Sequence, residues 1–397
     1  MKQQHRVTLI LAFLFVAAAA SGGCAGSKKK AGPTNTAEPV ASSSFAQTWF
    51  YPVGVKGDAV DRLYLRGDML FVYTKNQMVY TLGSDGGDFR FFCDPEVSGG
   101  VLRAPVILGE HIVYPCGSTI DIFNKLGRKV RTITLAKPTR SGAVGSGKMI
   151  YMGLDNPGGY GVVASIDITQ PYRVINWELF CFGAVTPTPA LYDRVLFAGD
   201  EHGELRAVSE ERAAVWPLAG GVFKTQGKFV SDIKADDFGV YAANTDSKLY
   251  CLDRQTGKIK WQFYAGTSLK TDPVITPSLV YQFVPGEGLI AIDKTTGDFD
   301  RKPRWIVKNA VQMLSEDQKN VYLRRKDNRL MAIDKASGDL LFLSHGSFDV
   351  FTTNLQSPII YAAKKDGKVY AIHPVLSEGE VGHMVMGDFR VEPLAMR

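Results

Sequence analysis

The chain has 397 residues, enough for two or three ordinary domains, and its 45% hydrophobic and 22% charged residues are typical of a soluble globular protein. The net charge of +6 is mild and comes without a dense basic stripe, so it gives little support for nucleic-acid binding, although a basic surface suits anionic partners or lipid headgroups. No segment beyond the N-terminal region is predicted to cross a membrane.

The N-terminus has the pattern of a targeting segment. Three basic residues in the first six precede an apolar stretch at 7–20, and small residues at 21–23 then precede Cys24. This order resembles a bacterial lipoprotein signal, which implies that the Cys24 thiol is acylated and that cleavage occurs directly before it. The alternative is ordinary cleavage after the alanines at 17–20, which would leave Cys24 as an unused thiol on a soluble periplasmic or secreted protein.

We therefore expect three parts: a leader at 1–23, an acylated cysteine and disordered tether at 24–44, and a folded domain at 45–397. The tether is small, polar and proline-containing, without an apolar period. About 20 flexible residues give a root-mean-square reach of about 25 Å. By the lipoprotein resemblance, Ala25 after the cysteine implies sorting to the periplasmic face of the outer membrane.

A short apolar segment ending in Asp or a close variant recurs eight times in the folded part. The last residues of the copies stand at 83, 124, 167, 209, 253, 293, 334 and 373. A period of about 40–45 residues with several short strands in each period is typical of a propeller. The sequence therefore predicts an all-β, eight-bladed β-propeller.

The copy around residues 229–263 shows how one blade is encoded. Alternating apolar segments at 229–235, 240–243, 248–252 and 258–263 are separated by turn residues, which predicts four antiparallel strands. Residues 48–51 precede the first innermost strand as an outer strand would, so we expect them to complete the eighth blade and close the ring. The tail at 379–391 is the alternative source of that strand.

An Asp-x-x-Thr/Ser-Gly turn recurs in the second half of the chain. The carboxylate can accept N–H bonds within the turn, and glycine supplies the positive φ that a bulged hairpin needs. A metal or acid role is disfavoured because there is one such aspartate in each blade. The predicted structural turn residues are Asp253, Gly257, Asp293, Gly297, Asp334 and Gly338.

Large aromatic side chains follow these positions at similar spacing. Each can cover the gap between two blades and bury about 150–250 Å². Stacking on carbohydrate is the alternative, but placement in register with the repeat favours packing. The predicted blade-packing residues are Trp177, Trp216, Trp261 and Trp305.

Four further cysteines follow Cys24, and an oxidising compartment would permit disulfides. Cys251 and Cys116 occupy positions that are alanine in other copies, which favours small buried side chains. Cys93 and Cys181 lie near the ends of predicted outer strands, where pairing stays open. Buried free thiols are the favoured prediction for all four.

The segment from Leu249 to Trp261 (LYCLDRQTGKIKW) resembles the PQQ-like, or quinoprotein, propeller repeat. Together with the signal, cysteine and tether, the chain looks like the propeller lipoprotein of the outer-membrane β-barrel assembly machinery. The resemblance implies a non-catalytic scaffold that contacts the barrel-assembly core subunit and nascent outer-membrane proteins. The alternative is a periplasmic propeller that binds or senses a glycan or another envelope protein.

A quinone-dependent dehydrogenase is the third and most distant hypothesis. By the resemblance, such enzymes carry an adjacent cysteine pair over the cofactor, and no two cysteines are adjacent here. The chain lacks His-Glu-x-x-His, Cys-x-x-Cys, a phosphate-binding glycine loop and Gly-x-Ser-x-Gly. We therefore expect no enzymatic activity, no cofactor and no metal.

Two loops are the places where binding is most easily added to the repeat. The connection at 153–161 is longer than its counterparts. Basic residues also fill the equivalent hairpins of the last two blades, where they either blunt exposed turns or form a face for an acidic partner. These possible partner-binding residues are Arg324, Arg325, Lys326, Lys364 and Lys365.

Overall fold

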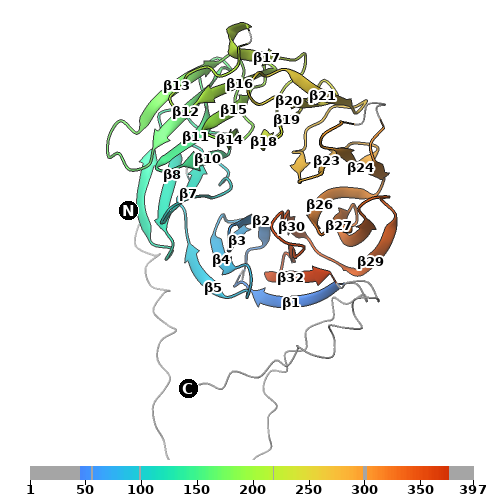
Figure 1. Ribbon diagram of the computed structural model, residues 1–397. Helices are drawn as coiled ribbons and strands as arrows, with labels where there is room; N and C mark the ends of the chain where they lie inside the picture. The colour runs from blue at the N-terminus through green and yellow to red at the C-terminus, as the bar shows by residue number, and fades with distance from the viewer. Residues whose placement is uncertain (1–44, 55–56, 98–99, 218, 298–301, 375–397) are drawn as a thin grey trace, which may run out of the picture. The chain divides into compact units, whose positions relative to one another are not determined.

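The computed structural model describes residues 45–54, 57–97, 100–217, 219–297 and 302–374. They form eight four-stranded antiparallel sheets arranged as the blades of a ring (Figure 1). This confirms the predicted eight-bladed propeller. The predicted leader, Cys24, the tether and the tail at 379–391 lie outside the described residues. Nowhere in the described part is there a helix of the length and hydrophobicity that a bilayer crossing requires.

We number the blades I to VIII from the first complete sheet. In each blade the first strand lies innermost and the fourth outermost. Blade I consists of β2 (Val60–Arg66), β3 (Met69–Thr74), β4 (Val79–Gly83) and β5 (Phe89–Cys93); blade II of β6 (Val106–Leu108), β7 (His111–Cys116), β8 (Thr119–Asn124) and β9 (Lys129–Thr134). Blade III consists of β10 (Ala143–Ser146), β11 (Met149–Asp155), β12 (Gly161–Asp167) and β13 (Ile175–Cys181); blade IV of β14 (Ala190–Tyr192), β15 (Val195–Gly199), β16 (Glu204–Ser209) and β17 (Val222–Lys224), which a 3-10 turn, η1 (Ala219–Gly221), precedes.

The second half repeats the same order. Blade V consists of β18 (Lys234–Ala235), β19 (Val240–Ala243), β20 (Lys248–Leu252) and β21 (Ile259–Tyr264); blade VI of β22 (Val274–Ile275), β23 (Leu279–Val284), β24 (Gly288–Asp293) and β25 (Trp305–Val307). Blade VII consists of β26 (Ala310–Glu316), β27 (Asn320–Arg325), β28 (Arg329–Asp334) and β29 (Leu340–Ser347); blade VIII of β30 (Val350–Thr352), β31 (Ile360–Ala363), β32 (Lys368–Pro374) and β1 (Phe45–Pro52). The eight repeated sequence segments are the third strands.

The N-terminal strand closes the ring. β1 pairs antiparallel with β32, with Trp49 opposite Ala371, so the two ends of the described chain share one sheet (Figure 1). This confirms the predicted closure by residues 48–51. Closure leaves no unpaired first or last blade, which is how a propeller protects its sheet edges.

The innermost strand of blade V is shorter than predicted. Only Lys234 and Ala235 pair as a strand, although residues 229–235 were expected to do so. The Phe229 N–H donates instead to the carbonyl of Asp200 in blade IV (3.1 Å), and its ring is fully buried. The apolar pattern here therefore reflects packing between two blades rather than pairing within one sheet.

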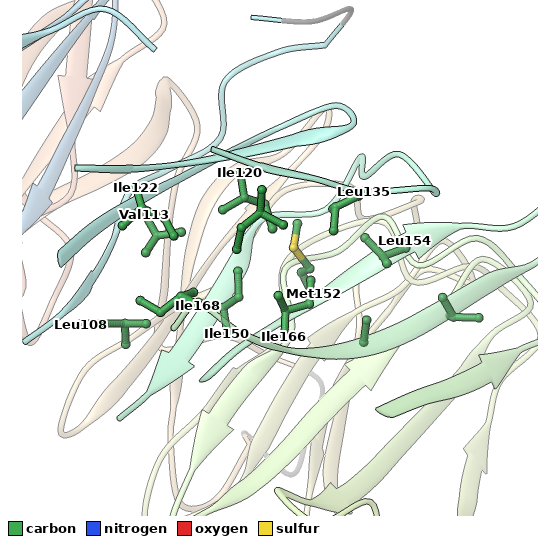
Figure 2. Packing of buried hydrophobic residues seen from close by; sticks show 13 residues of the cluster. Leu108, Val113, Ile120, Ile122, Leu135, Ile150, Met152, Leu154, Ile166 and Ile168 are labelled. Carbon is green, nitrogen blue, oxygen red and sulfur yellow. The ribbon is translucent and has the colours of Figure 1, made fainter. Parts of the chain in front are cut away.

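Packing between neighbouring blades forms the core. Figure 2 shows the layer between blades II and III, where Val113, Ile120 and Ile122 face Ile150 and Met152. Blade II has one of the weakest copies of the repeat, but its inward residues are still aliphatic, and burial of each contributes about 1.5–3 kcal/mol. The weak match of this copy to the repeat therefore does not extend to the residues that pack it in the ring.

The four cysteines of the described chain are buried, and their thiols are free. Burial raises the pKa of Cys93, Cys181 and Cys251 to about 12 and raises that of Cys116 as well. The structure thus confirms buried free thiols, including for the two cysteines whose pairing was left open. A thiol that stays protonated at neutral pH is a poor nucleophile, so none of them is suited to covalent chemistry.

A candidate docking surface on blades III and IV

The long connection predicted at 153–161 is a longer hairpin rather than a longer loop. Gly153, Leu154 and Asp155 continue β11, and residues 156–160 alone form the turn. Both paired strands have seven residues, since Asp155 still pairs with Gly161. The turn is closed by the Asn156 N–H, which donates to the Tyr160 carbonyl (2.9 Å), and the hairpin carries the Tyr160 ring at its end.

Tyr160 begins a row of exposed rings that crosses from blade III to blade IV. The ring centroids of Tyr160 and Phe180 are 5.3 Å apart, those of Phe180 and Phe182 are 5.5 Å apart, and those of Phe182 and His202 are 6.0 Å apart. Tyr160, Phe180 and Phe182 are 42%, 45% and 55% exposed. We call these four residues the aromatic row. Adjacent exposed rings of this size usually mark a binding surface.

Gly183 lets blade IV come close enough to form the row, and Gly161 lets the segment after β13 pack against β12. A Cβ on Gly183 would lie 2.2 Å from the His202 backbone nitrogen, and one on Gly161 would lie 2.8 Å from the Gly183 carbonyl oxygen. Any side chain at Gly183 would therefore push the turn carrying His202 away from Phe182. The Glu201 N–H also donates to the Ala184 carbonyl (3.0 Å), which fixes this turn against blade III.

Asp200 holds the His202 turn from inside. Its Oδ1 accepts hydrogen bonds from the N–H groups of His202 (2.9 Å) and Glu204 (3.0 Å). Its Oδ2 is buried and has no hydrogen-bond partner in the described part of the chain. Burial raises the pKa of Asp200 above its usual value, although the two N–H groups act in the opposite direction. The carboxyl group is thus a structural anchor that is costly to ionise.

Ion pairs surround the aromatic row. Glu178, two residues before Phe180 on β13, pairs with Lys137 (2.7 Å). Asp155 pairs with Arg140 (2.9 Å) in the Tyr160 hairpin, and Glu201 pairs with Lys228 (3.0 Å) beside His202. An aromatic centre that a partner can desolvate, with a charged, half-exposed rim around it, is the usual anatomy of a protein–protein contact.

The geometry of the row suits side chains better than sugars. Phe180 and Phe182 are at 86° to each other, and Tyr160 and Phe180 are at 41°, so the rings do not make one flat platform. The nearby charged groups already have partners within the chain, which leaves few of them to bind sugar hydroxyls. Edge-to-face rings instead create small apolar pockets that accept aliphatic or aromatic side chains.

The sequence pointed to only one end of this surface. The length of the Tyr160 hairpin was the signal, whereas Phe180, Phe182 and His202 were not singled out as binding residues. Phe180 and Phe182 are two residues apart, which places both side chains on one side of an extended chain. Their approach to His202 depends on the packing of blade III against blade IV and cannot be read from the strand pattern.

The predicted basic residues lie on the turns of blades VII and VIII that correspond to the Tyr160 hairpin. Arg324 is held by its own blade and by the next: its Nε donates to Asn328 Oδ1 (3.0 Å), and its guanidinium lies over the Phe351 ring of blade VIII at 5.3 Å. Burial lowers its pKa. Arg325 pairs with Asp327 (3.6 Å), and Lys364 is half-buried. Lys326 and Lys365 are exposed and are the most accessible of the five residues. Partner binding at these hairpins stays a prediction.

The predicted aromatic residues each reach the following blade. The indole N–H groups of Trp177, Trp216, Trp261 and Trp305 donate to the carbonyls of Glu210 (2.7 Å), Arg254 (3.0 Å), Lys294 (2.8 Å) and Lys335 (3.1 Å). Every acceptor is the first residue after the aspartate-like position of the next blade. Trp49, in the closing strand, makes the same bond to Ser84 (2.8 Å).

The predicted turns have the backbone that their residues suggested. Asp253 Oδ1 accepts from the N–H (2.8 Å) and hydroxyl (2.7 Å) of Thr256, and Gly257 has a φ of +69°. Asp293 and Asp334 bind turn N–H groups in the same way. Gly297 and Gly338 have φ values of +65° and +79°, and a Cβ there would lie 2.3 Å and 2.6 Å from atoms of Trp261 and Trp305. One turn thus both closes its own hairpin and receives the indole of the preceding blade.

The central cavity, of about 1700 Å³, is lined by the inner strands of the blades. Its described charged lining is mixed and slightly acidic: Arg66, Asp68, Lys125, Asp232, Lys234, Asp236, Asp237, Asp272 and Lys294. Lys234 pairs with Asp232 (3.5 Å) and Lys294 with Asp236 (2.8 Å). Pyrroloquinoline quinone is a tricarboxylate and would need a set of uncommitted cations, which this lining does not offer. The residues present do not fit that cofactor.

The described residues likewise give no support for a metal site. Across the described ranges, no three His, Cys, Asp or Glu side chains are grouped so that they could hold a metal ion.

Comparison with known proteins supports the repeat. Residues 201–341, from the His202 turn to β29, match the family model described as "Outer membrane protein assembly factor BamB". Within this range the blades are similar to PQQ-like propeller repeats. Among proteins with curated descriptions, no sequence matches significantly.

Solved structures extend the likeness in fold to the whole ring. BamB from Moraxella catarrhalis is 14% identical, with 83% of this chain and 97% of that chain covered and a TM-score of 0.63. The computationally designed protein Ika8 is 13% identical, with coverage of 82% and 98% and a TM-score of 0.63. Quinohemoprotein alcohol dehydrogenase from Comamonas testosteroni is 10% identical, with coverage of 83% and 76% and a TM-score of 0.62. At such identities the likeness shows a shared fold, and proteins of unlike function share it.

Proposed function

We propose that this protein is a non-catalytic scaffold of the bacterial envelope that docks protein partners through the aromatic row. The observation that carries the proposal is the continuous exposed row from Tyr160 to His202, framed by ion pairs on two blades. A rigid ring that presents such a surface at one junction is suited to holding a partner in a fixed orientation.

The finer proposal is a role in outer-membrane β-barrel assembly. It is supported by the family model that matches residues 201–341 and by the likeness in fold to a BamB structure. The expected partners are the barrel-assembly core subunit and nascent outer-membrane proteins. Acylation of Cys24, with the tether behind it, would hold the ring at the periplasmic face of the outer membrane.

The test is affinity purification of the tagged full-length protein from gently solubilised envelopes, followed by mass spectrometry. The wild type should recover the barrel-assembly core subunit in stoichiometric amount. The double substitution Phe180→Ser and Phe182→Ser should reduce that recovery at least about tenfold, because losing two central aromatic contacts typically costs 2 kcal/mol or more of binding.

The matched control is Ile259→Ser with Tyr264→Ser, two exposed apolar residues on the outer strand of blade V. It removes comparable apolar surface and should leave recovery unchanged. Equal loss in both variants, or no loss in either, would contradict docking through the aromatic row. Enrichment of a glycan in place of a protein, abolished by the Phe180 and Phe182 substitutions, would favour the alternative of a glycan-binding propeller.

A further inference from the structure

Blade VIII differs from the other seven in how its third strand is connected to its fourth. In blades I to VII a short stretch of chain joins these two strands. In blade VIII, β32 ends at Pro374, and the neighbouring strand β1 begins at Phe45, at the other end of the described chain. No described turn therefore joins the third and fourth strands of blade VIII.

That turn has a second role in other blades, because it covers the aromatic residue of the preceding blade. Trp261 and Trp305 donate to the carbonyls of Lys294 and Lys335, and they are only 7% and 5% exposed. The side chain of Phe91 in blade I has no N–H to donate, but it still packs against the turn of blade II. A Cβ added to Gly127 of that turn would lie 2.8 Å from the Cβ of Phe91. The cover thus does not depend on the hydrogen bond.

Blade VII carries its aromatic residue in the same register. Phe342 is opposite Ala332 of the neighbouring strand, as Trp305 is opposite Ala291 in blade VI. Phe342 nevertheless remains 42% exposed, and Leu340 and Leu341 beside it are 55% and 44% exposed. We call these three residues the seam patch. They are the only three consecutive large apolar residues of the described chain that are all exposed.

We infer that the segment directly after Pro374 lies over the seam patch and serves as the missing cover. By the repeat, His373 stands where Asp293 and Asp334 stand, so Pro374 corresponds to the carbonyl-bearing Lys294 and Lys335. The next two residues of the sequence are Val375 and Leu376, an apolar pair at the point where the other turns meet the aromatic side chain. Burial of the seam patch by these residues removes apolar surface from water on both sides.

The N-terminal segment is less suited to this position. Its last residues before Phe45 are Ala41 and three serines, which offer little apolar surface. Phe45 itself is already buried, with its ring edge-on to Tyr322 at a centroid distance of 6.2 Å. Phe45 therefore belongs to the core between blades VII and VIII, whereas Val375 and Leu376 directly follow β32 in the sequence.

The test places the photoreactive residue p-benzoylphenylalanine at position 342 of the full-length protein. Irradiation followed by proteolysis and mass spectrometry should give an intramolecular cross-link from position 342 to residues 375–379. Phe180→p-benzoylphenylalanine is the positive control, because its ring is next to Tyr160 and should cross-link to residues 156–160. Cross-links from position 342 only to residues 1–44 or only to another protein, or none at all while the control reacts, would overturn the inference.

A second measurement separates cover from general destabilisation. A chain ending at Pro374 should bind more of the hydrophobic dye ANS than the full-length chain, and Phe342→Ser in that shorter chain should remove most of the increase. A chain ending at Gly379 keeps Val375 and Leu376 and should behave like the full-length protein. Equal dye binding by all three lengths would contradict the inference, and none of these results depends on the docking partner.

Discussion

The junctions between blades V and VI and between blades VII and VIII use the same outer-strand position in different ways. Trp261 at the first is nearly buried and bonded to Lys294, whereas Phe342 at the second is half-exposed in the described structure. The strand that carries each residue is similar, so the strand is not the cause. What differs is whether the next blade supplies a turn, and a residue's energetic weight in a propeller thus depends on the blade that follows it.

The largest effect on stability is expected from removing the indole of Trp261 at the junction between blades V and VI. Trp261→Ala should lower the free energy of unfolding by about 3–5 kcal/mol, because it empties a buried aromatic site. Phe342→Ala in a chain ending at Pro374 should cost less than about 1 kcal/mol, since much of that ring is already in water. The midpoint of urea unfolding measures both changes.

Trp261→Phe is the control for that prediction. It keeps most of the packing and loses the bond to the Lys294 carbonyl, so it should cost about 1–2 kcal/mol. Similar losses for Trp261→Ala and for Phe342→Ala in the shorter chain would mean that the cover by the next blade has little effect on stability.

A smaller effect is expected from the turn that receives the indole. Gly297→Ala should cost about 2–3 kcal/mol, because its φ is +65° and the added Cβ would lie 2.3 Å from Trp261. Gly266→Ala has the same backbone strain, with φ at +72°, but nothing lies within 4 Å of its Cβ, and it should cost about 1 kcal/mol. Thermal unfolding of the two variants separates strain from collision, and equal shifts would show that Trp261 moves aside without loss.

The smallest effect tests a junction that has no aromatic residue. Between blades II and III, Arg131 Nη2 donates to the Gln170 carbonyl (2.7 Å). In the same turn, Asp167 Oδ1 accepts hydrogen bonds from the N–H (2.9 Å) and the hydroxyl (2.6 Å) of Thr169. Burial alone would raise the pKa of Asp167, but the Lys148 ammonium (2.8 Å) and the hydroxyl and N–H of Thr169 outweigh it and lower that pKa to about 2. The ionised form is thus favoured by folding.

Because its folded-state pKa is depressed, Asp167 contributes stability above pH 4 and loses it as the pH falls from about 4 to about 2. Asp167→Asn should lower the free energy of unfolding by about 1–2 kcal/mol at pH 7, with the difference from wild type shrinking below pH 4. Urea unfolding at several pH values measures this. Lys148→Gln should remove much of the same pH dependence, and a difference that is constant from pH 7 to pH 3 would contradict the assignment.

The repeat made most of the ring predictable, because every blade is built from the same kind of short strands and turns. The third strands, the glycines at positive φ and the closing role of residues 48–51 all follow from patterns a few residues long. The inner strand of blade V was not predicted correctly, because Phe229 packs between blades IV and V and does not pair in the sheet of blade V. Of the candidate docking surface, the sequence indicated the Tyr160 hairpin and missed its three partners.

The sequence alone determined how many blades there are and which residues turn, because hairpins depend on neighbouring residues and on intrinsic backbone preferences. Only the tertiary structure decided which aromatic residues are exposed. Phe182 meets His202 because Gly183 lets blade IV approach, and Phe342 is half-exposed among the described residues because no described turn joins β32 to β1. Both outcomes depend on contacts between blades, which form between segments that are distant in sequence.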